Sequence, residues 1–314
     1  MNEDYLWDRS GEPDAETARL EGLLGQLRYS GHAPEQRRSA RRFGRPWWVA
    51  AAAVVLAGVG IVARMHEGPV TLWQLSVGDQ NARAVRAGQM IETGTSTHAR
   101  LESTATGQVD IDPKSRLRLV AAGDKQQRFD LQRGTIHAFI WAPPGRFVVD
   151  TPSSKTIDLG CRYTLQVSEN GTGLLTVETG WVAFEWQKRE SFIPAGAACV
   201  TRPRLGPGTP YFADAPAELR AALDRFDTKA DAAALTEAIG AARPRDAVSL
   251  WHLLIRTEGS GRGAVFDRFA TLVHLPEQVT KAAVLRGDAE AIDGAWNALD
   301  LGETTWWRNW KRSW

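Results

Sequence analysis

The chain has 314 residues and a formal net charge of +1, with 24% charged and 43% hydrophobic residues. Its length exceeds that of a typical single domain, and its composition is an ordinary globular balance. Nucleic-acid-binding domains usually carry a clear basic excess on one face. The near-zero net charge therefore argues against direct nucleic-acid binding.

The first segment, residues 1–46, is predicted to be helical and to end in a basic linker. Apolar side chains recur in it at i, i+3, i+4 and i+7, which is the spacing of one helix face. These side chains follow an aromatic start and are Trp7, Leu20, Leu23, Leu24 and Leu27. So short a segment builds little core of its own, so we predict that the stripe binds a groove on a partner protein. The alternative is that two short helices pack on each other.

Residues 47–64 are predicted to form a transmembrane helix. The run from Trp47 to Ala63 contains no charged residue, and about 20 mostly apolar residues span the ~30 Å hydrocarbon core of a bilayer. Five arginines, at positions 37, 38, 41, 42 and 45, precede the run, whereas only Arg64 follows it closely. The positive-inside rule then keeps residues 1–46 cytoplasmic and places the residues after 65 on the exported side of the membrane.

Two other interpretations of this apolar run fit less well. A cleaved signal peptide would need a charged leader of 46 residues, and no small-x-small cleavage site follows the apolar run before Arg64. Residues 58–63 also spell the G-x-G-x-x-A pattern of dinucleotide-binding folds. That pattern needs several helical turns after its glycines, but Gly68 and Pro69 come only eight and nine residues after Gly60. We therefore expect a protein that crosses the membrane once.

Residues 70–201 alternate apolar and polar side chains with a period of two, which predicts many short antiparallel strands. One hairpin is expected between strands 163–168 and 174–184, because the Asn170-Gly171 pair supplies the positive φ of a tight turn. Asp110 and Asp112 have the spacing of a carboxylate pair, but their alternation with apolar neighbours favours a solvated strand face.

Several short motifs follow one another in this region with a characteristic order and spacing. They are GQMIETG from Gly88, ARL from Ala99, GQVDI from Gly107, SRLRL from Ser115, LQRGTI from Leu131, FVVDTP from Phe147 and DLGCRY from Asp158. Together they resemble the periplasmic domain of the FecR family, over roughly Leu72 to Phe192. Many members have threonine where this chain has Cys161, and Tyr163 supplies the aromatic ring that follows.

FecR-like proteins are single-pass inner-membrane regulators of sigma factors of the extracytoplasmic-function (ECF) type. The resemblance therefore implies a location in the bacterial inner membrane, with the residues after 65 in the periplasm. It also implies an ECF-type sigma factor as the partner of residues 1–46, and an unknown periplasmic partner or ligand for the β domain. The segment with which iron-uptake members dock an outer-membrane transporter has no recognisable counterpart, so siderophore signalling is not implied.

The two cysteines, Cys161 and Cys199, both fall in the exported region. An oxidising compartment permits a disulfide between them. Two buried free thiols are the alternative, because a sequence does not give the geometry that a disulfide needs.

Residues 202–215 are predicted to be a linker, because proline and glycine are frequent in them. Helical periodicity returns over residues 216–314, with breaks at Pro244, at residues 259–263 and at Pro276. Four or five short helices are expected, as a small bundle or as stacked pairs. The last nine residues hold four tryptophans, which either fix the chain end to this domain or contact the membrane interface, a carbohydrate or a protein.

Motifs of enzyme chemistry are missing from the sequence. The six histidines lack the H-x-x-x-H and H-E-x-x-H spacings, and there is no C-x-x-C pair, G-x-S-x-G elbow or phosphate-binding loop. We therefore expect no catalytic residue, no metal site and no cofactor.

The predicted fold is a short cytoplasmic α segment, one transmembrane helix, an all-β FecR-like domain of short antiparallel strands and a C-terminal all-α domain. This arrangement predicts a regulator that holds an ECF-type sigma factor inside the cell and relays an envelope signal received by its β domain. The alternative function is a membrane-anchored envelope scaffold or module that binds polysaccharide or protein and has no transcriptional role.

Overall fold

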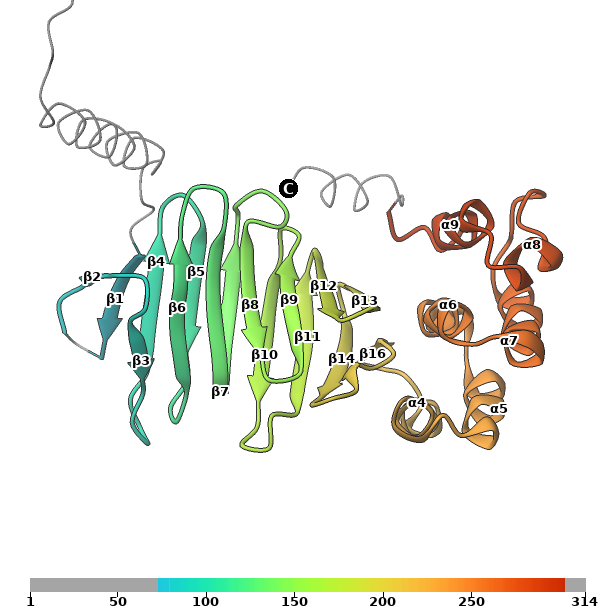
Figure 1. The fold of residues 1–314 in the computed structure, drawn as a ribbon, viewed down its shortest axis with the longest axis horizontal. Coiled ribbons are helices and arrows are strands. Elements are labelled where there is room, and N and C mark those ends of the chain that lie inside the picture. The colour runs from blue at the N-terminus through green and yellow to red at the C-terminus, as the bar shows by residue number, and fades with distance from the viewer. Residues whose placement is uncertain (1–72, 79, 303–314) are drawn as a thin grey trace, which may run out of the picture. The chain divides into compact units, whose positions relative to one another are not determined.

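The structure is a computed structural model that describes residues 73–78 and 80–302. Within these residues, sixteen strands are followed by six α-helices and one 3-10 helix (Figure 1). This confirms a large, mainly antiparallel β domain with a helical region after it. No helix in this described part is long and apolar enough to cross a membrane. The segments predicted to be cytoplasmic (1–46) and transmembrane (47–64) lie outside the described residues and stay predictions.

The strands form two hydrogen-bonded sheets that share one long strand. Sheet A runs in the order β2 (Arg83–Val85), β1 (Trp73–Val77), β4 (Ala99–Ser103), β5 (Gly107–Ile111), β7 (Gln127–Ile140), β10 (Arg162–Val167), β11 (Gly173–Thr179) and β14 (Ala197–Arg202), with β15 (Gly206–Pro207) and β16 (Tyr211–Phe212) both paired to β14. Sheet B runs in the order β3 (Met90–Glu92), β6 (Arg116–Ala122), β7, β8 (Phe147–Thr151), β9 (Ser154–Asp158), β12 (Trp181–Trp186) and β13 (Arg189–Pro194). The pairs recorded within the described residues are antiparallel, except that β7 and β8 are parallel.

Strand β7 passes from one sheet to the other at Gly134. Residues before Gly134 pair with β6 and β8, whereas Gly134 and the residues after it pair with β10 or β5. Gly134 has φ +95°, and a Cβ on it would lie 2.2 Å from the Oγ of Ser115. The same Oγ accepts a hydrogen bond of 3.0 Å from the N–H of Thr135. The backbone therefore approaches Ser115 as closely as only glycine allows.

A cluster of aromatic rings lies between the two sheets. The Trp73 ring of sheet A contacts Phe129 of sheet B edge to face, at 5.2 Å between centroids, and Phe129 lies 5.4 Å from Phe147. All three side chains are almost fully buried. The indole N–H of Trp73 donates to the side-chain oxygen of Gln127 at 2.9 Å, so the polar atom of this large side chain is satisfied inside the core.

The hairpin predicted around Asn170-Gly171 is confirmed, because β10 pairs with β11 across this turn. The single strand predicted over 174–184 is wrong, because the chain leaves sheet A after β11 and enters sheet B as β12. Gly180 lies at the break with φ +75°, and a Cβ there would come within 2.1 Å of the carbonyl oxygen of Gly160. Alternation alone does not reveal such a crossover, since residues on both sides of it continue to face the core.

The helical region contains α4 (Ala217–Lys229), α5 (Ala232–Ala241), the 3-10 helix η1 (Pro244–Asp246), α6 (Ala247–Arg256), α7 (Gly259–Leu272), α8 (Lys281–Leu285) and α9 (Ala289–Asn297). The glycines at 259–263, predicted as a break, instead form the first turns of α7. The segment 202–215, predicted as a linker, is packed against the sheet: residues 206–210 are buried, and β15 and β16 extend sheet A.

Replacing Gly134 with alanine tests the importance of the crossover in β7. We expect Gly134→Ala to lower the free energy of unfolding by about 3 kcal/mol or more, because the new methyl group would overlap Ser115 at a backbone angle that alanine avoids. Chemical denaturation of the purified full-length protein measures this change.

Gly240→Ala is the matched control for this substitution. Gly240 lies in α5, and apart from its chain neighbours and the backbone of its own helix, no atom lies within 4 Å of the place a Cβ would occupy. This change is therefore expected to raise stability by roughly 0.5–1 kcal/mol. Equal effects of the two substitutions would contradict a steric requirement for glycine at position 134.

Candidate functional site

The residues predicted to bind a sigma factor lie outside the described part of the chain, and their role stays a prediction. They are Trp7, Leu20, Leu23, Leu24 and Leu27.

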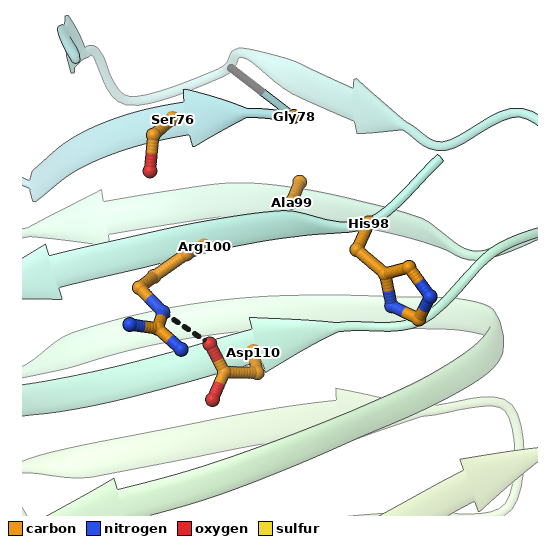
Figure 2. A pocket seen from close by; sticks show the side chains of 6 residues that line it. All are labelled: Ser76, Gly78, His98, Ala99, Arg100 and Asp110. Atoms are coloured by element: carbon orange, nitrogen blue, oxygen red, sulfur yellow. Dashed lines mark hydrogen bonds and ion pairs between the residues drawn. The ribbon is translucent and has the colours of Figure 1, made fainter. Parts of the chain in front are cut away.

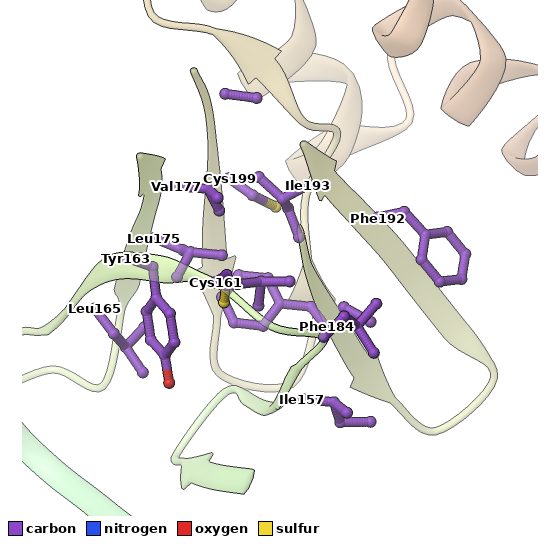
Figure 3. Packing of buried hydrophobic residues seen from close by; sticks show 14 of the residues in the cluster. Ile157, Cys161, Tyr163, Leu165, Leu175, Val177, Phe184, Phe192, Ile193 and Cys199 are labelled. Atoms are coloured by element: carbon purple, nitrogen blue, oxygen red, sulfur yellow. The ribbon is translucent and has the colours of Figure 1, made fainter. Parts of the chain in front are cut away.

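The two cysteines predicted as a possible disulfide are free thiols in the structure, and both are buried (Figure 3). The thiol of Cys161 donates to a carboxylate oxygen of Asp158, and that of Cys199 donates to the carbonyl of Gly208 at 3.2 Å. Burial raises the pKa of Cys199 to about 12 and also raises the pKa of Cys161, with the charge of Asp158 adding to the effect. Both thiols are therefore protonated at neutral pH, and neither is a ready nucleophile.

A buried carboxylate occupies the DLGCRY motif where the chain crosses from sheet B to sheet A. Asp158 is 1% exposed and accepts hydrogen bonds from the N–H of Gly160 at 2.7 Å and from the Cys161 thiol. The hydroxyl of Tyr163 is buried nearby and has no hydrogen-bond partner among the described residues. Burial raises the pKa of Asp158 to about 7, although both hydrogen bonds oppose this shift. The proton on this carboxyl is therefore gained or lost near neutral pH.

A second buried group of polar side chains joins the helical region to the β domain, and we call this contact the junction. The guanidinium of Arg256, at the end of α6, donates to Thr209 and Ser191 at 2.6 Å each and to Asp227 of α4 at 3.3 Å. Asp227 also accepts hydrogen bonds from Arg189 of β13 and from the backbone and side chain of Thr209. Burial lowers the pKa of Arg256 to about 10, so it stays charged at neutral pH. The side chains of Arg256 and Asp227 are both less than a tenth exposed. Removing either charge would therefore leave the other buried without its counter-charge.

His252 lies beside this group and links the same two parts of the protein. Its Nε2 accepts a hydrogen bond of 3.0 Å from the N–H of Phe192, so Nδ1 carries the proton and donates to the carbonyl of Val248 at 2.8 Å. Burial, with the positive charge of Arg256, lowers the pKa of His252 to about 3. Trp296 of α9 packs at 4.6 Å from Trp251 and 5.7 Å from Trp181 of β12, which adds apolar contact to the junction.

The outer face of sheet A carries a continuous row of exposed polar side chains. Arg100 of β4 donates to Asp110 of β5, and His137 of β7 contacts Asp112 at 3.1 Å and Thr164 of β10 at 2.9 Å. The expectation that the two aspartates lie on a solvated strand face is consistent with this arrangement. Near this row is a cavity of about 410 Å³, lined by Ser76, Gly78, His98, Ala99, Arg100 and Asp110 (Figure 2).

Two large aromatic side chains lie in the same part of sheet A. Trp141 is 50% exposed and Phe139 43% exposed, and their rings meet edge to face at 5.5 Å. The guanidinium of Arg162 lies over the Phe139 ring at 4.4 Å, and the Trp141 indole donates to the carbonyl of Thr104. The rings are thus held in place while open to solvent, an arrangement that suits binding. We define the outer face of sheet A as the candidate binding surface.

Sequence reasoning missed the buried polar groups at the junction. Arg189, Asp227 and Arg256 are far apart along the chain, and each has the residue type of an ordinary surface position. A weak signal exists for Arg256, which ends the apolar run LWHLLI of α6. Phe139 could have been noticed, because it breaks the polar side of an alternating strand.

The described residues thus define a two-sheet β domain with a polar and aromatic outer surface and an attached helical region. Residues 89–183, in the β domain, match the family model described as FecR protein. This match assigns the segment to the FecR family and confirms the resemblance inferred from the sequence.

Two crystal structures of a proposed anti-sigma factor from Parabacteroides distasonis are similar to part of the chain. The one at 1.65 Å resolution has 14% sequence identity and a TM-score of 0.36, and the alignment covers 44% of this chain and 65% of that one. The one at 2.50 Å resolution has 14% identity and a TM-score of 0.35, with coverage of 44% and 64%. The aligned part is less than two thirds of those chains. No curated protein matches.

Asp158→Asn tests the buried carboxyl through the pH dependence of stability. Because the folded-state pKa of about 7 lies above the unfolded value near 3.8, Asp158 favours folding below pH 4, and this contribution is lost as pH rises to 7. Asparagine does not titrate, so we expect Asp158→Asn to remove this loss of stability with rising pH. The unfolding free energy of the variant relative to wild type should therefore rise by a few kcal/mol between pH 4 and 7. Denaturation midpoints across this range measure the difference, and a difference independent of pH would refute the buried-acid assignment.

Asp227→Asn tests the junction. The substitution leaves Arg189 and Arg256 without their shared counter-charge, and we expect a loss of about 3–5 kcal/mol in unfolding free energy. Asp224→Asn is the matched control, since Asp224 lies on the same helix but is 49% exposed in its pair with Arg202, and we expect a loss below about 1 kcal/mol. Similar losses for both variants would mean that the buried cluster does not hold the two parts together.

Proposed function

We propose that the protein is a single-pass inner-membrane regulator that binds an ECF-type sigma factor through residues 1–46 and relays a signal received by its periplasmic β domain. The observation that carries this proposal is the FecR match at residues 89–183, placed after an apolar run that arginines precede. Proteins of the family that this chain resembles have the same order of parts.

The candidate binding surface supports the reception of a signal by the β domain. Its exposed rings and its row of charged and imidazole groups offer both apolar contact and hydrogen bonds to a ligand or partner. Exposed aromatic side chains held by neighbours are common at binding sites, because they supply contact area at low entropic cost.

The same surface also favours a second candidate function, that of an envelope scaffold or binding module. Phe139 and Trp141 would suit a sugar ring or a protein side chain equally well. In that case residues 1–46 would serve for membrane topology alone, and the two functions differ in what the inner segment does.

A bacterial two-hybrid screen of residues 1–46 against every sigma factor of the source genome tests the proposal. We expect one ECF-type partner, and we expect Leu23→Asp combined with Leu27→Asp to abolish the interaction, because charges would interrupt the apolar stripe. Ala18→Asp is the control, since a helix would place residue 18 on the side opposite the leucines. A complete screen without a partner rejects the sigma-factor role.

Deleting residues 2–30 from the full chain separates the two candidate functions. A regulator would lose its effect on transcription from sigma-dependent promoters. An envelope module would keep its envelope phenotype, because its membrane segment and β domain remain intact.

A further inference from the structure

A cleft lies where the β12–β13 hairpin, the turn between β14 and β15 and the end of α6 meet. Its volume is about 330 Å³, within the range of small-molecule sites. Three aliphatic or aromatic side chains form one part of its lining, namely Trp186, Leu205 and Ile255. A Cβ on Gly206 would lie 2.8 Å from the Trp186 ring, so the glycine lets this ring lie directly against the backbone.

The rest of the lining is strongly cationic. Lys188, Arg189, Arg204 and Arg256 all line the cleft, and Glu190 is the one carboxylate among the lining residues. Asp227 lies behind this wall and is shared by Arg189 and Arg256. Four cations therefore face two carboxylates, and Arg256 also offsets the negative end of the α6 dipole. The excess positive charge favours an anion in the cleft.

Two turns at the edge of the cleft hold residues other than glycine at positive φ. Gln187, in the two-residue turn between Trp186 and Arg189, has φ +53°, and Arg204 has φ +67°. Such turns favour glycine or asparagine. Arg204 itself contributes a cation to the lining of the cleft, and Lys188 is next to Gln187 in the hairpin.

Three buried N–H groups around the cleft lack a hydrogen-bond partner among the described residues. They are the indole Nε1 of Trp186 and the Nε atoms of Arg189 and Arg256. These atoms are enclosed by protein, so an anion in the cleft would contact the exposed side chains of Lys188 and Arg204 instead.

We propose that this cleft binds an oxyanion, a phosphate monoester or a carboxylate, carried on a small apolar body. The anionic group would lie against Lys188 and Arg204, and the apolar body against Trp186, Leu205 and Ile255. This site is separate from the outer face of sheet A, and its existence does not depend on sigma-factor binding.

Isothermal titration calorimetry of the full-length protein with phenyl phosphate and phenylacetate tests the proposal. We expect binding of at least one of them, weakened three- to tenfold by Lys188→Ala and by Arg204→Ala, and weakened further by added salt. The tighter of the two probes identifies phosphate or carboxylate as the preferred group. Inorganic phosphate should bind less tightly than phenyl phosphate, because it has no apolar body.

Lys125→Ala is the matched control, because Lys125 is another exposed lysine, in the turn between β6 and β7. It should leave binding of both probes unchanged. Lys188 and Arg204 are exposed, so their substitution should leave the melting temperature unchanged and the binding data interpretable. The proposal is overturned if neither phenyl compound binds, if Lys125→Ala weakens binding as much as the other two variants, or if inorganic phosphate binds as tightly as phenyl phosphate.

Discussion

The sharing of β7 between two sheets is the constraint on which the rest of the β domain depends. One strand with two sets of partners forces its neighbours to lie in different layers, so the chain must cross between sheets repeatedly. Glycines at positive φ occur at these crossings, at positions 134, 160, 180 and 196. The core, the buried turn at Asp158 and the exposed face of sheet A all follow from this alternation between layers.

The helical region is attached through polar contacts as well as through packing. Replacing a buried ion pair with apolar side chains often leaves stability unchanged, so the Arg256–Asp227 pair is weak evidence for extra stability. The hydrogen bonds of this pair are, however, directional. Together with those of His252 they connect α4 and α6 to β13 and to residues 208–209. Hydrogen bonds of this kind fix orientation more strictly than the contacts among Trp181, Trp251 and Trp296 alone.

The sequence predicts those features that depend on neighbouring residues. Alternation identified the β region, and Asn170-Gly171 identified a hairpin, because both signals are local. The break at Gly180 was missed, since a strand that changes sheets keeps its alternation. The cluster of Arg189, Asp227 and Arg256 was missed because these residues meet only after three separate elements have packed. The segment 202–215 has the composition of a linker, yet its backbone groups pair with β14.

The proposed oxyanion site and the junction share two side chains. Arg189 and Arg256 both line the cleft, and both donate to Asp227 of α4, which is 7% exposed. An anion held against Lys188 and Arg204 would add negative charge to the cleft that these two guanidinium groups also line. Because Arg189 and Arg256 belong to both, the charge in the cleft and the ion pairs that attach the helical region act on the same side chains.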